Sequence, residues 1–566
     1  MKNTLNIILL SSAFNGLTQR VWLSLKEAGY QVSFLLFTTE QEVINSIETA
    51  HPDLVICPFL KDRVPEVLWK NETRPIIIIH PGIRGDRGAS SLDWAILKNL
   101  DTWGVTALQA VEEMDAGPIW ASHEFKKPAL IRKSELYNNF VSDAAIKCIF
   151  EVIDKFINKE KPTPLDYNNE NVKGRLEPNM KQSDRHFEWT SSAKDILNIV
   201  NSAEGIPGVL AEIEGEKFYI YDAYLDHREG EAGKLLARRE DAVLIGTGEK
   251  SLWIGSLKRA AKNQLPFKLP AVQVLKEKAE SLKDLTLSLY DMVLSNEEYS
   301  TIHYSQKGKI GELTFNFYNG AMSTQQCERM IKAIQFAKEQ ETNVLIIKGG
   351  YNAFSNGVHL NTIEAAENPA EEAWKNIHAI DDVCLELLDT KQWVIAGLTG
   401  SAGAGGVMLA LTADFIAARD GIILNPHYAT MGLYGSEYWT YTLPKRVGEQ
   451  QARKLTEECL PISVTRALEI GLIDSIGPRE INNFNEWLWV QAKESEEVNK
   501  KALKKPFDSE KAAECRKKEL EEMKEDMLYD RNSFSVKRNC FVLKKRACNT
   551  PDRLIANWAR VKQNKE

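Results

Sequence analysis

The sequence predicts a multidomain α/β protein with a doubly wound, largely parallel sheet at its start. Apolar runs of strand length alternate with amphipathic helical patterns over residues 5–57. A similar alternation returns after residue 312, so a second α/β domain is expected. The length of 566 residues suits roughly three to four domains.

Composition excludes several classes of protein. A net charge of −8 argues against general nucleic-acid binding. The eight cysteines form no C-x-x-C pair, so we expect reduced thiols in a cytoplasmic protein, with neither a disulfide framework nor a metal site. The apolar run Leu5–Leu10 is too short for a signal peptide core and is predicted to be the first strand. No stretch approaches the roughly 20 apolar residues of a membrane span, so no membrane contact is expected.

The first domain is expected over residues 1–170. The predicted strands are Leu5–Leu10, Gln31–Phe37 and Leu54–Cys57, and the predicted helices are Leu17–Ala28, Gln41–Thr49 and a long closing helix, Lys133–Ile157. No G-x-G-x-x-G motif follows the first strand, which argues against a nicotinamide cofactor.

The most informative stretch follows the apolar run Pro75–Ile79, which is predicted to be a buried strand. His80 then stands at the carboxyl end of that strand, where open α/β sheets place their ligand crevice. Glycines and prolines turn the chain at once, and Ser90 or Ser91 can cap a helix that begins near Leu92. A core histidine beside a tight turn is the alternative. The loop also holds the charged residues Arg84, Asp86 and Arg87, which suit an anionic ligand.

Two motifs here resemble the 10-formyltetrahydrofolate-dependent formyltransferases. The first comprises His80-Pro81, Arg87-Gly88 and Asp93-Trp94-Ala95-Ile96, and the second comprises Gly104-Val105-Thr106 and Met114-Asp115-Ala116-Gly117. The resemblance implies that 10-formyltetrahydrofolate binds here, with His80 and Asp115 catalytic and with Arg84, Arg87 and Ser91 in the formyl-folate loop. His80 would support the tetrahedral oxyanion, and Asp115 would orient His80 or take a proton. The family has Asn two residues before the histidine, but this chain has Ile78, which leaves open how the formyl oxygen is held.

The middle of the chain predicts a connecting and supporting region. Residues 161–181 are rich in Pro, Asn and Lys and are expected to be a linker. Residues 182–285 carry a helical pattern, Ser192–Ser202, and then alternating strands such as Lys217–Asp222 and Ala242–Gly246. They resemble the small β-barrel subdomain that follows the catalytic domain in formyltransferases, for which a supporting role is expected.

The third domain, expected over residues 295–566, contains two glycine-bearing turns. One is Phe354–Leu360, and the other is Thr399–Gly406 after the predicted strand Trp393–Leu398. This pair resembles the crotonase (enoyl-CoA hydratase/isomerase) family and implies coenzyme A binding. By that match, the backbone N–H groups of Val358 and Gly405 form an oxyanion hole for a thioester carbonyl. Glycine permits close backbone approach, and a helix start favours developing negative charge.

The departures from the crotonase pattern restrict the chemistry. Hydratases use two carboxylates, but the first position falls at Met408 and the second at Tyr428, or at His427 with a different gap. Hydration of an enoyl-CoA is therefore not expected. Glu437 is the only carboxylate in the segment 425–444, and its aromatic neighbours favour a raised pKa. We expect Glu437 to be the base, with Tyr428 or Tyr438 as its proton partner; an exposed glutamate at a helix start is the alternative.

Residues 515–528 can form an amphipathic helix with Leu520, Met523 and Met527 in one stripe. We expect this helix to pack on the crotonase-like core or on another protomer. The basic stretch 537–560 is a weaker candidate for contact with CoA phosphates.

The fusion of these two halves resembles the HypX (HoxX) family of [NiFe]-hydrogenase maturation proteins. The resemblance implies formyl transfer from 10-formyltetrahydrofolate to CoA and then decarbonylation of formyl-CoA to carbon monoxide. The hydrogenase maturation machinery would accept the CO. The alternatives are a formyltetrahydrofolate hydrolase or amine formyltransferase fused to an acyl-CoA enzyme, and a non-catalytic scaffold for hydrogenase assembly.

Overall fold

The structure is a computed structural model that describes residues 4–167, 169, 172–261, 265–288, 298–499 and 507–560. The chain divides into two compact units, residues 1–211 with 546–566 and residues 212–545, which are described in turn. Within the described residues, no helix is long and apolar enough to cross a membrane. The expected domain limits stay predictions, and those at residues 170 and 295 fall outside the described residues.

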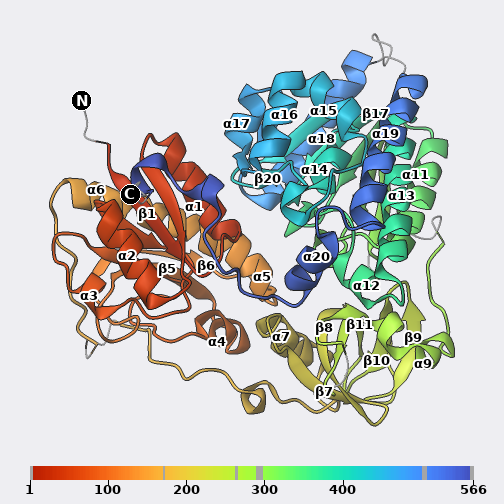
Figure 1. The fold of residues 1–566 in the computed structure, drawn as a ribbon. Coiled ribbons are helices and arrows are strands. Elements are labelled where there is room, and N and C mark those ends of the chain that lie inside the picture. Colours follow the sequence, from red (N-terminus) through yellow and green to blue (C-terminus); the bar gives the residue numbers. More distant parts are fainter. Residues whose placement is uncertain are drawn as a thin grey trace. The chain divides into compact units, whose positions relative to one another are not determined.

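The first unit is built on one six-stranded sheet in the order β2-β1-β3-β4-β5-β6 (Figure 1). Its strands are β1 (Asn6–Ser11), β2 (Gln31–Leu36), β3 (Leu54–Cys57), β4 (Ile76–His80), β5 (Thr102–Gln109) and β6 (Ile119–Lys126). Strands β1 to β4 are parallel, as the sequence predicts, but β5 pairs antiparallel with both β4 and β6. The expectation of a parallel sheet is therefore only partly right, since the short β5–β6 connection can join only antiparallel strands.

The first unit also contains helices, and polar side chains cap the N-termini of several of them. They are α1 (Gly16–Glu27), α2 (Glu40–Ala50), α3 (Glu66–Trp69), α4 (Ser91–Leu97), α5 (Lys133–Glu135), α6 (Ser142–Ile157), α7 (Ala193–Ser202) and the 3₁₀ turn η2 (Gln182–Arg185). Asn15 caps α1 and Thr39 caps α2 through their side chains. The single helix expected over residues 133–157 is interrupted by a π-helical turn, η1 (Leu136–Val141).

The expected serine cap on α4 is wrong. The helix begins at Ser91, and Ser90 makes no side-chain cap hydrogen bond. The Ser90 hydroxyl instead accepts a hydrogen bond from the Met180 N–H (2.9 Å), and the Ser91 hydroxyl donates to the Pro81 carbonyl (2.8 Å). Both hydroxyls thus tie the loop after β4 to other backbone, which is the competing use of serine side chains.

The stretch expected to be a linker packs along this same loop. Arg87 N–H donates to the Arg175 carbonyl (3.1 Å), and Glu177 N–H donates back to the Arg87 carbonyl (3.1 Å). The Val172 side chain is buried. Residues 172–180 therefore form a wall of the His80 loop rather than a free connection.

The C-terminal stretch 546–560 also belongs to the first unit, although the sequence placed it in the third domain. Thr550 Oγ1 accepts a hydrogen bond from the Leu36 N–H (2.9 Å), and Ser33 Oγ accepts one from the Ala556 N–H (3.1 Å). Leu36 and Ser33 both lie on β2, the edge strand of the sheet. The tail therefore covers an edge that is otherwise open to pairing.

The second unit begins with an antiparallel sheet in the order β7-β8-β11-β10-β9, with the short β12 on β11. The elements are β7 (Val209–Ile213), β8 (Glu216–Asp226), β9 (Leu235–Arg239), β10 (Ala242–Gly246), β11 (Ser251–Arg259), β12 (Leu269–Pro270), α8 (Ala271–Leu275) and α9 (Glu277–Glu280). This is the small β-subdomain that the sequence predicts.

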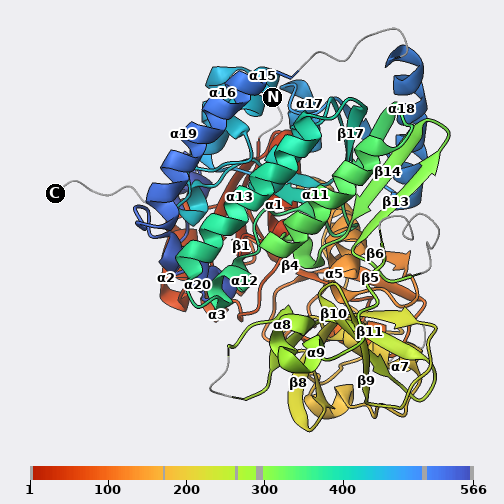
Figure 2. The same cartoon turned by 90° about the vertical axis from the view of Figure 1, so that its right-hand side faces the viewer.

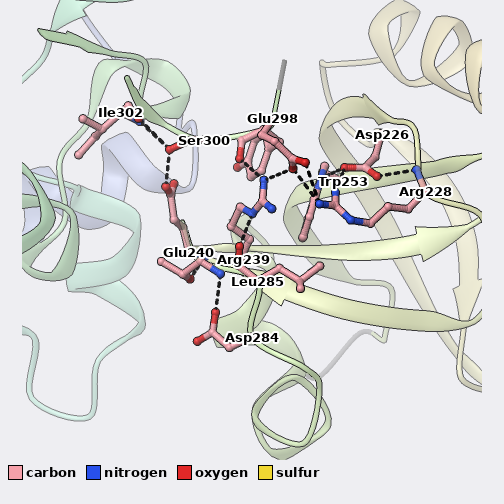
Figure 3. Close-up of polar contacts among 12 residues, drawn as sticks. Asp226, Arg228, Arg239, Glu240, Trp253, Asp284, Leu285, Glu298, Ser300 and Ile302 are labelled. Atoms are coloured by element: carbon pink, nitrogen blue, oxygen red, sulfur yellow. Dashed lines mark hydrogen bonds and ion pairs between the residues drawn. The ribbon is translucent and has the colours of Figure 1, made fainter. Parts of the chain in front are cut away.

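A buried arginine joins this β-subdomain to the start of the next sheet (Figure 3). The Arg239 side chain is 1% exposed and donates to the Leu285 carbonyl (2.7 Å), the Glu298 carboxylate (2.8 Å) and the Tyr299 carbonyl (2.7 Å). Its guanidinium also lies over the Trp253 ring at 5.0 Å. The rigid guanidinium group holds all three hydrogen-bond partners at once, so Arg239 anchors the chain just before β13.

The remaining core is formed by two sheets, β13-β14-β15-β17-β19-β22 and the smaller β16-β18-β20-β21. Their strands are β13 (Ile302–Lys307), β14 (Ile310–Phe315), β15 (Val344–Lys348), β16 (Ala353–Ser355), β17 (Trp393–Leu398), β18 (Ser401–Gly403), β19 (Phe415–Arg419), β20 (Ile423–Asn425), β21 (Ile462–Ser463) and β22 (Ser475–Gly477). Strands β14, β15, β17, β19 and β22 run parallel, and the largely apolar sequences of β15 and β17 suit burial on both faces.

Helices surround these sheets, and the C-terminal helix α19 lies beside α13 (Figure 2). The helices are α11 (Thr324–Glu339), α12 (Leu360–Ala365), α13 (Pro369–Leu388), α14 (Gly405–Ala410), α15 (Trp439–Val447), α16 (Glu449–Glu458), α17 (Val464–Glu469), α18 (Ile481–Asn499), α19 (Ser509–Met527) and α20 (Phe534–Val542). The expected packing of the 515–528 helix on this core is confirmed, because Met523 and Met527 join its main apolar cluster.

Candidate active sites

The first candidate site is centred on His80, the last residue of β4. Its imidazole is 4% exposed, and Nε2 lies 2.8 Å from Asp86 Oδ2. On the other side of the ring, Nδ1 lies 3.5 Å from Asp115 Oδ2. The structure thus brings together the two residues expected to be catalytic and adds a third, Asp86, between them in the chain.

The turn after His80 fits this arrangement only because residue 82 is glycine. A Cβ on Gly82 would lie 2.2 Å from Asp86 Oδ2 and 2.5 Å from His80 Nε2. Side chains from distant segments hold the turn: Trp103 Nε1 donates to the Pro81 carbonyl (2.8 Å), and Thr106 Oγ1 donates to the Gly82 carbonyl (2.8 Å).

The charge state of His80 follows from its carboxylate neighbours. Burial disfavours the imidazolium, but the hydrogen bond with Asp86 and the charges of Asp115 and Asp86 together outweigh it, so the pKa of His80 is raised. A protonated imidazole is a donor at both nitrogens. The positive charge of this side chain can therefore stabilise a developing oxyanion.

The other three residues expected in the formyl-folate loop, Arg84, Arg87 and Ser91, differ in their contacts and exposure. Arg87 lies over the Tyr167 ring at 4.4 Å and pairs with Glu113. Arg84 is exposed, and its carbonyl accepts a hydrogen bond from the Gly174 N–H (3.2 Å). Ser91 is buried and holds the Pro81 carbonyl, so it supports the turn.

Two further features of this site bear on the sequence analysis. Ile78, where formyltransferases have Asn, is half-buried and packs against an apolar cluster, and its hydrocarbon side chain offers no hydrogen-bond donor. Asp86 was grouped with the arginines as a ligand contact and was missed as a partner of His80. The signal was its position six residues after His80 in a glycine-rich turn.

The second candidate site forms where β16 and β18 end side by side. These strands are parallel neighbours, and the turns after them carry Val358 and Gly405. A Cβ on Gly357 would lie 3.4 Å from the Gly405 nitrogen, so the two turns are in contact. In the described part of the chain, the N–H groups of Val358 and Gly405 find no hydrogen-bond acceptor. Two such free donors from adjoining turns suit an oxyanion hole.

Glu437 lies directly against this pair of turns. A Cβ on Gly405 would lie 1.9 Å from Glu437 Oε1, so only glycine leaves room for the carboxyl group. The other oxygen, Oε2, accepts a hydrogen bond from the Tyr428 hydroxyl (2.7 Å). Glu437 is 1% exposed, so the alternative of an exposed glutamate at a helix start is wrong.

Burial sets the protonation of this pair. Burial and then the nearby charge of Asp381 raise the pKa of Glu437 to about 8. Burial and the Glu437 charge also raise the pKa of Tyr428 well above its usual value. Tyr428 is therefore a proton donor at neutral pH, whereas Glu437 titrates close to the working pH of an enzyme.

The backbone at Glu437 is strained and held in place by carboxylates. Glu437 and Tyr438 both have a positive φ, at 58° and 59°, which costs non-glycine residues about 1–3 kcal/mol each. Asp381 Oδ1 accepts from the Glu437 N–H (2.9 Å), and Glu519 Oε2 accepts from the Tyr438 N–H (3.0 Å).

These two carboxylates were missed by the sequence analysis. Glu519 lies on α19, whose apolar stripe was recognised but whose buried acidic side chains were not. The signal was present in the spacing, because Cys515, Glu519, Met523 and Asp526 fall on one helical face and all are buried. Of the hydratase positions, Met408 is fully buried in the core, while the His427 N–H donates to the Asn425 carbonyl (2.8 Å).

Comparison with known proteins identifies the parts and their combination. The chain matches the formyl transferase family over residues 26–153, the formyl transferase C-terminal domain over 179–271 and the enoyl-CoA hydratase/isomerase family over 306–540. It is 39% identical to the hydrogenase maturation factor HoxX of Bradyrhizobium diazoefficiens over 83% of this chain and 81% of that protein. The chain belongs to the HypX (HoxX) family of hydrogenase maturation proteins.

Structural comparison agrees with this assignment. HypX from Aquifex aeolicus, in a crystal structure with tetrahydrofolic acid, matches with a TM-score of 0.92 at 38% identity, over 99% of this chain and 100% of that one. Methionyl-tRNA formyltransferase of Streptococcus equi subsp. equi is 23% identical over 36% of this chain and 64% of its own length. The expected fold class, a Rossmann-like formyltransferase half joined to a crotonase-like half, is confirmed.

Proposed function

We propose that the chain makes carbon monoxide for the iron centre of a [NiFe]-hydrogenase in two steps. The first transfers a formyl group from 10-formyltetrahydrofolate to the thiol of CoA, and the second decarbonylates formyl-CoA to CO and CoA. Membership of the HypX (HoxX) family supports the maturation role, and the hydrogenase maturation machinery is the proposed acceptor of CO.

In the first step, the CoA sulfur adds to the formyl carbon of 10-formyltetrahydrofolate. Asp115 takes the thiol proton or orients His80, and the imidazolium of His80 stabilises the oxygen of the tetrahedral adduct. The carbon–nitrogen bond then breaks, and the folate nitrogen takes a proton. A thiol ionises near pH 8.5, so it needs less activation than an amine, which suits a site with Ile78 in place of Asn.

In the second step, the N–H groups of Val358 and Gly405 hold the formyl oxygen. Glu437 takes the proton from the formyl carbon as the carbon–sulfur bond breaks, which releases CO and the CoA thiolate. Tyr428 gives its proton to the thiolate and regains one from Glu437, so the site returns to its starting state. Of the two tyrosines expected as partners, Tyr428 is favoured because its hydroxyl bonds to Glu437.

The observation that carries this proposal is the position of the Glu437 carboxyl against Gly405. It supports a buried base beside the carbonyl site. Met408, which stands where a hydratase carboxylate is expected, cannot activate water. Exclusion of water favours release of CO over hydrolysis to formate.

The test is turnover of 10-formyltetrahydrofolate with and without CoA, with CO trapped by reduced haemoglobin. We expect CO only when both substrates are present. Formate released regardless of CoA would favour the formyltetrahydrofolate hydrolase, and formyl transfer to added amines would favour the amine formyltransferase. Absence of any turnover would favour the scaffold.

A further inference from the structure

Asp381 on α13 lies beneath the loop that carries Glu437. It is fully buried, and its Oδ1 accepts hydrogen bonds from Ser436 Oγ (2.5 Å) and from the Glu437 N–H (2.9 Å). Its Oδ2 lies 3.4 Å from Arg516 Nε of α19 and accepts no hydrogen bond from the described residues. A buried carboxylate with one unsatisfied oxygen costs stability, so its presence calls for a functional reason.

We propose that Asp381 is a positioning residue for the decarbonylation step, holding the backbone of Glu437 through one oxygen and acting on the Glu437 carboxyl through its charge. The inference rests on the proposed function of Glu437 as the base. It assigns a role to the ion pair between Asp381 of α13 and Arg516 of α19, which lies outside both glycine turns.

Few other charges face Glu437 within the described residues. The titratable groups that act on Glu437 or on its neighbour Asp381 come from α11, from α13, from α19 and from the Glu437 loop: Cys327, Asp381, Asp382, Cys384, Arg516, Glu519, Tyr428 and Tyr438. Burial raises the pKa of both cysteines and both tyrosines, so these groups stay neutral. The charge next to Glu437 therefore depends on the carboxyl groups and on Arg516.

Arg516 selects which buried carboxyl group is ionised. Burial raises the pKa of Asp381 to about 6, against the lowering effects of the Ser436 hydrogen bond and the Arg516 charge. Burial raises the pKa of Glu519, and its position next to Asp381 raises it further. At neutral pH, Asp381 is therefore the charged member, and its charge keeps a proton on Glu437 and makes the ionised Glu437 a stronger base.

Glu519 acts on the same loop in a different way. Its carboxyl accepts hydrogen bonds from the Tyr438 N–H and from the N–H and hydroxyl of Thr440. It makes no hydrogen bond to Ser436 or Glu437 in the described structure. Glu519 thus fixes the end of the loop, whereas Asp381 contacts the base-bearing residue itself.

The experiment measures CO release from supplied formyl-CoA across pH 5–9 for the full chain and for Asp381→Asn. The asparagine keeps an oxygen for Ser436 and the Glu437 N–H but removes the charge. We expect the rising limb of the profile to move to lower pH by about one unit, with a lower rate at pH 9. The matched control is Asp382→Asn, because the half-exposed Asp382 pairs with the same Arg516 but does not contact Glu437; its profile should not move.

Each outcome decides a separate question. A uniform loss of rate at every pH would make Asp381 merely structural and overturn the inference. Absence of CO from the wild-type protein would instead overturn the proposed function. If Asp381→Asn fails to fold, the wild-type profile still decides, since a rising limb near pH 5 would mean that the Asp381 charge does not reach Glu437.

Discussion

The two candidate active sites position their ionisable side chains in the same way, but one favours the charged form of its residue and the other favours the neutral form. Gly82 leaves the space that Asp86 occupies, and Gly405 leaves the space that Glu437 occupies. Two carboxylates flank His80 and favour its cation, whereas burial and the charge of Asp381 favour the neutral form of Glu437. The comparison teaches that a missing Cβ sets the position of such a group, while its charged neighbours set its protonation.

The largest expected effect separates the two sites by function. His80→Ala should lower formyl transfer by roughly 10²–10⁴ because it removes the oxyanion partner. The same variant should release CO from supplied formyl-CoA at the wild-type rate. Asp115→Asn should follow the same pattern. Chromatography of CoA esters measures the first step, and formyl transfer within about tenfold of wild type would remove His80 from the catalytic set.

The next effect tests whether glycine positions Glu437. Gly405→Ala should displace the carboxyl group and lower CO release by about 10²-fold, since small misplacements are that costly. Gly403→Ala is the control in the same turn, because its Cβ would meet only Asn356 Oδ1, at 3.1 Å. Equal losses in both variants would show that the turn, not the contact with Glu437, limits the reaction.

The rates of the two steps should also depend on pH in opposite directions. Formyl transfer should fall as pH rises through the raised pKa of His80, above its ordinary 6.5, because the imidazolium is lost. CO release from formyl-CoA should rise with pH up to about 8, because Glu437 must be ionised to accept a proton. Separate rate profiles for the two steps measure this, and parallel profiles would contradict the contrast between the sites.

The smallest effect is on stability. The pKa of Glu437 is about 8 in the folded chain and 4.5 as the ordinary value, so its contribution to stability is full below pH 4.5 and is lost as pH rises to 8. Glu437→Gln cannot ionise, so this variant should not lose stability as the pH rises. Relative to wild type, its Tm should rise by on the order of a few degrees at pH 8, with little change at pH 5. A difference independent of pH would mean that Glu437 is not protonated in the folded chain.

The sequence predicted the parts of this protein that depend on local pattern. Leu54–Cys57, Ala242–Gly246 and Trp393–Leu398 are strands at the predicted limits, because apolar runs bounded by turns determine them. The His80 corner and the glycine turns of Val358 and Gly405 were found for a related reason, since turn residues at fixed spacing are visible in one dimension. Their catalytic roles stay predictions.

What the sequence did not predict depends on contacts across the chain. Asp381 and Ser436 are 55 residues apart and Glu519 and Tyr438 are 81 apart, so no local pattern joins them. Buried carboxylates also contradict the rule that charged positions mark the exposed face of a helix. The reversed direction of β5 was missed because strand direction depends on which neighbour a strand joins.

The central claim is that Glu437 is the base that releases CO. Glu437→Gln is nearly isosteric but cannot accept the proton, so the variant should still make formyl-CoA from 10-formyltetrahydrofolate and CoA. The measurement is CO trapped by reduced haemoglobin, with CoA esters followed by chromatography in the same reaction. We predict that CO release stops while formyl-CoA, or formate from its slow hydrolysis, accumulates; undiminished CO from this variant would contradict the claim.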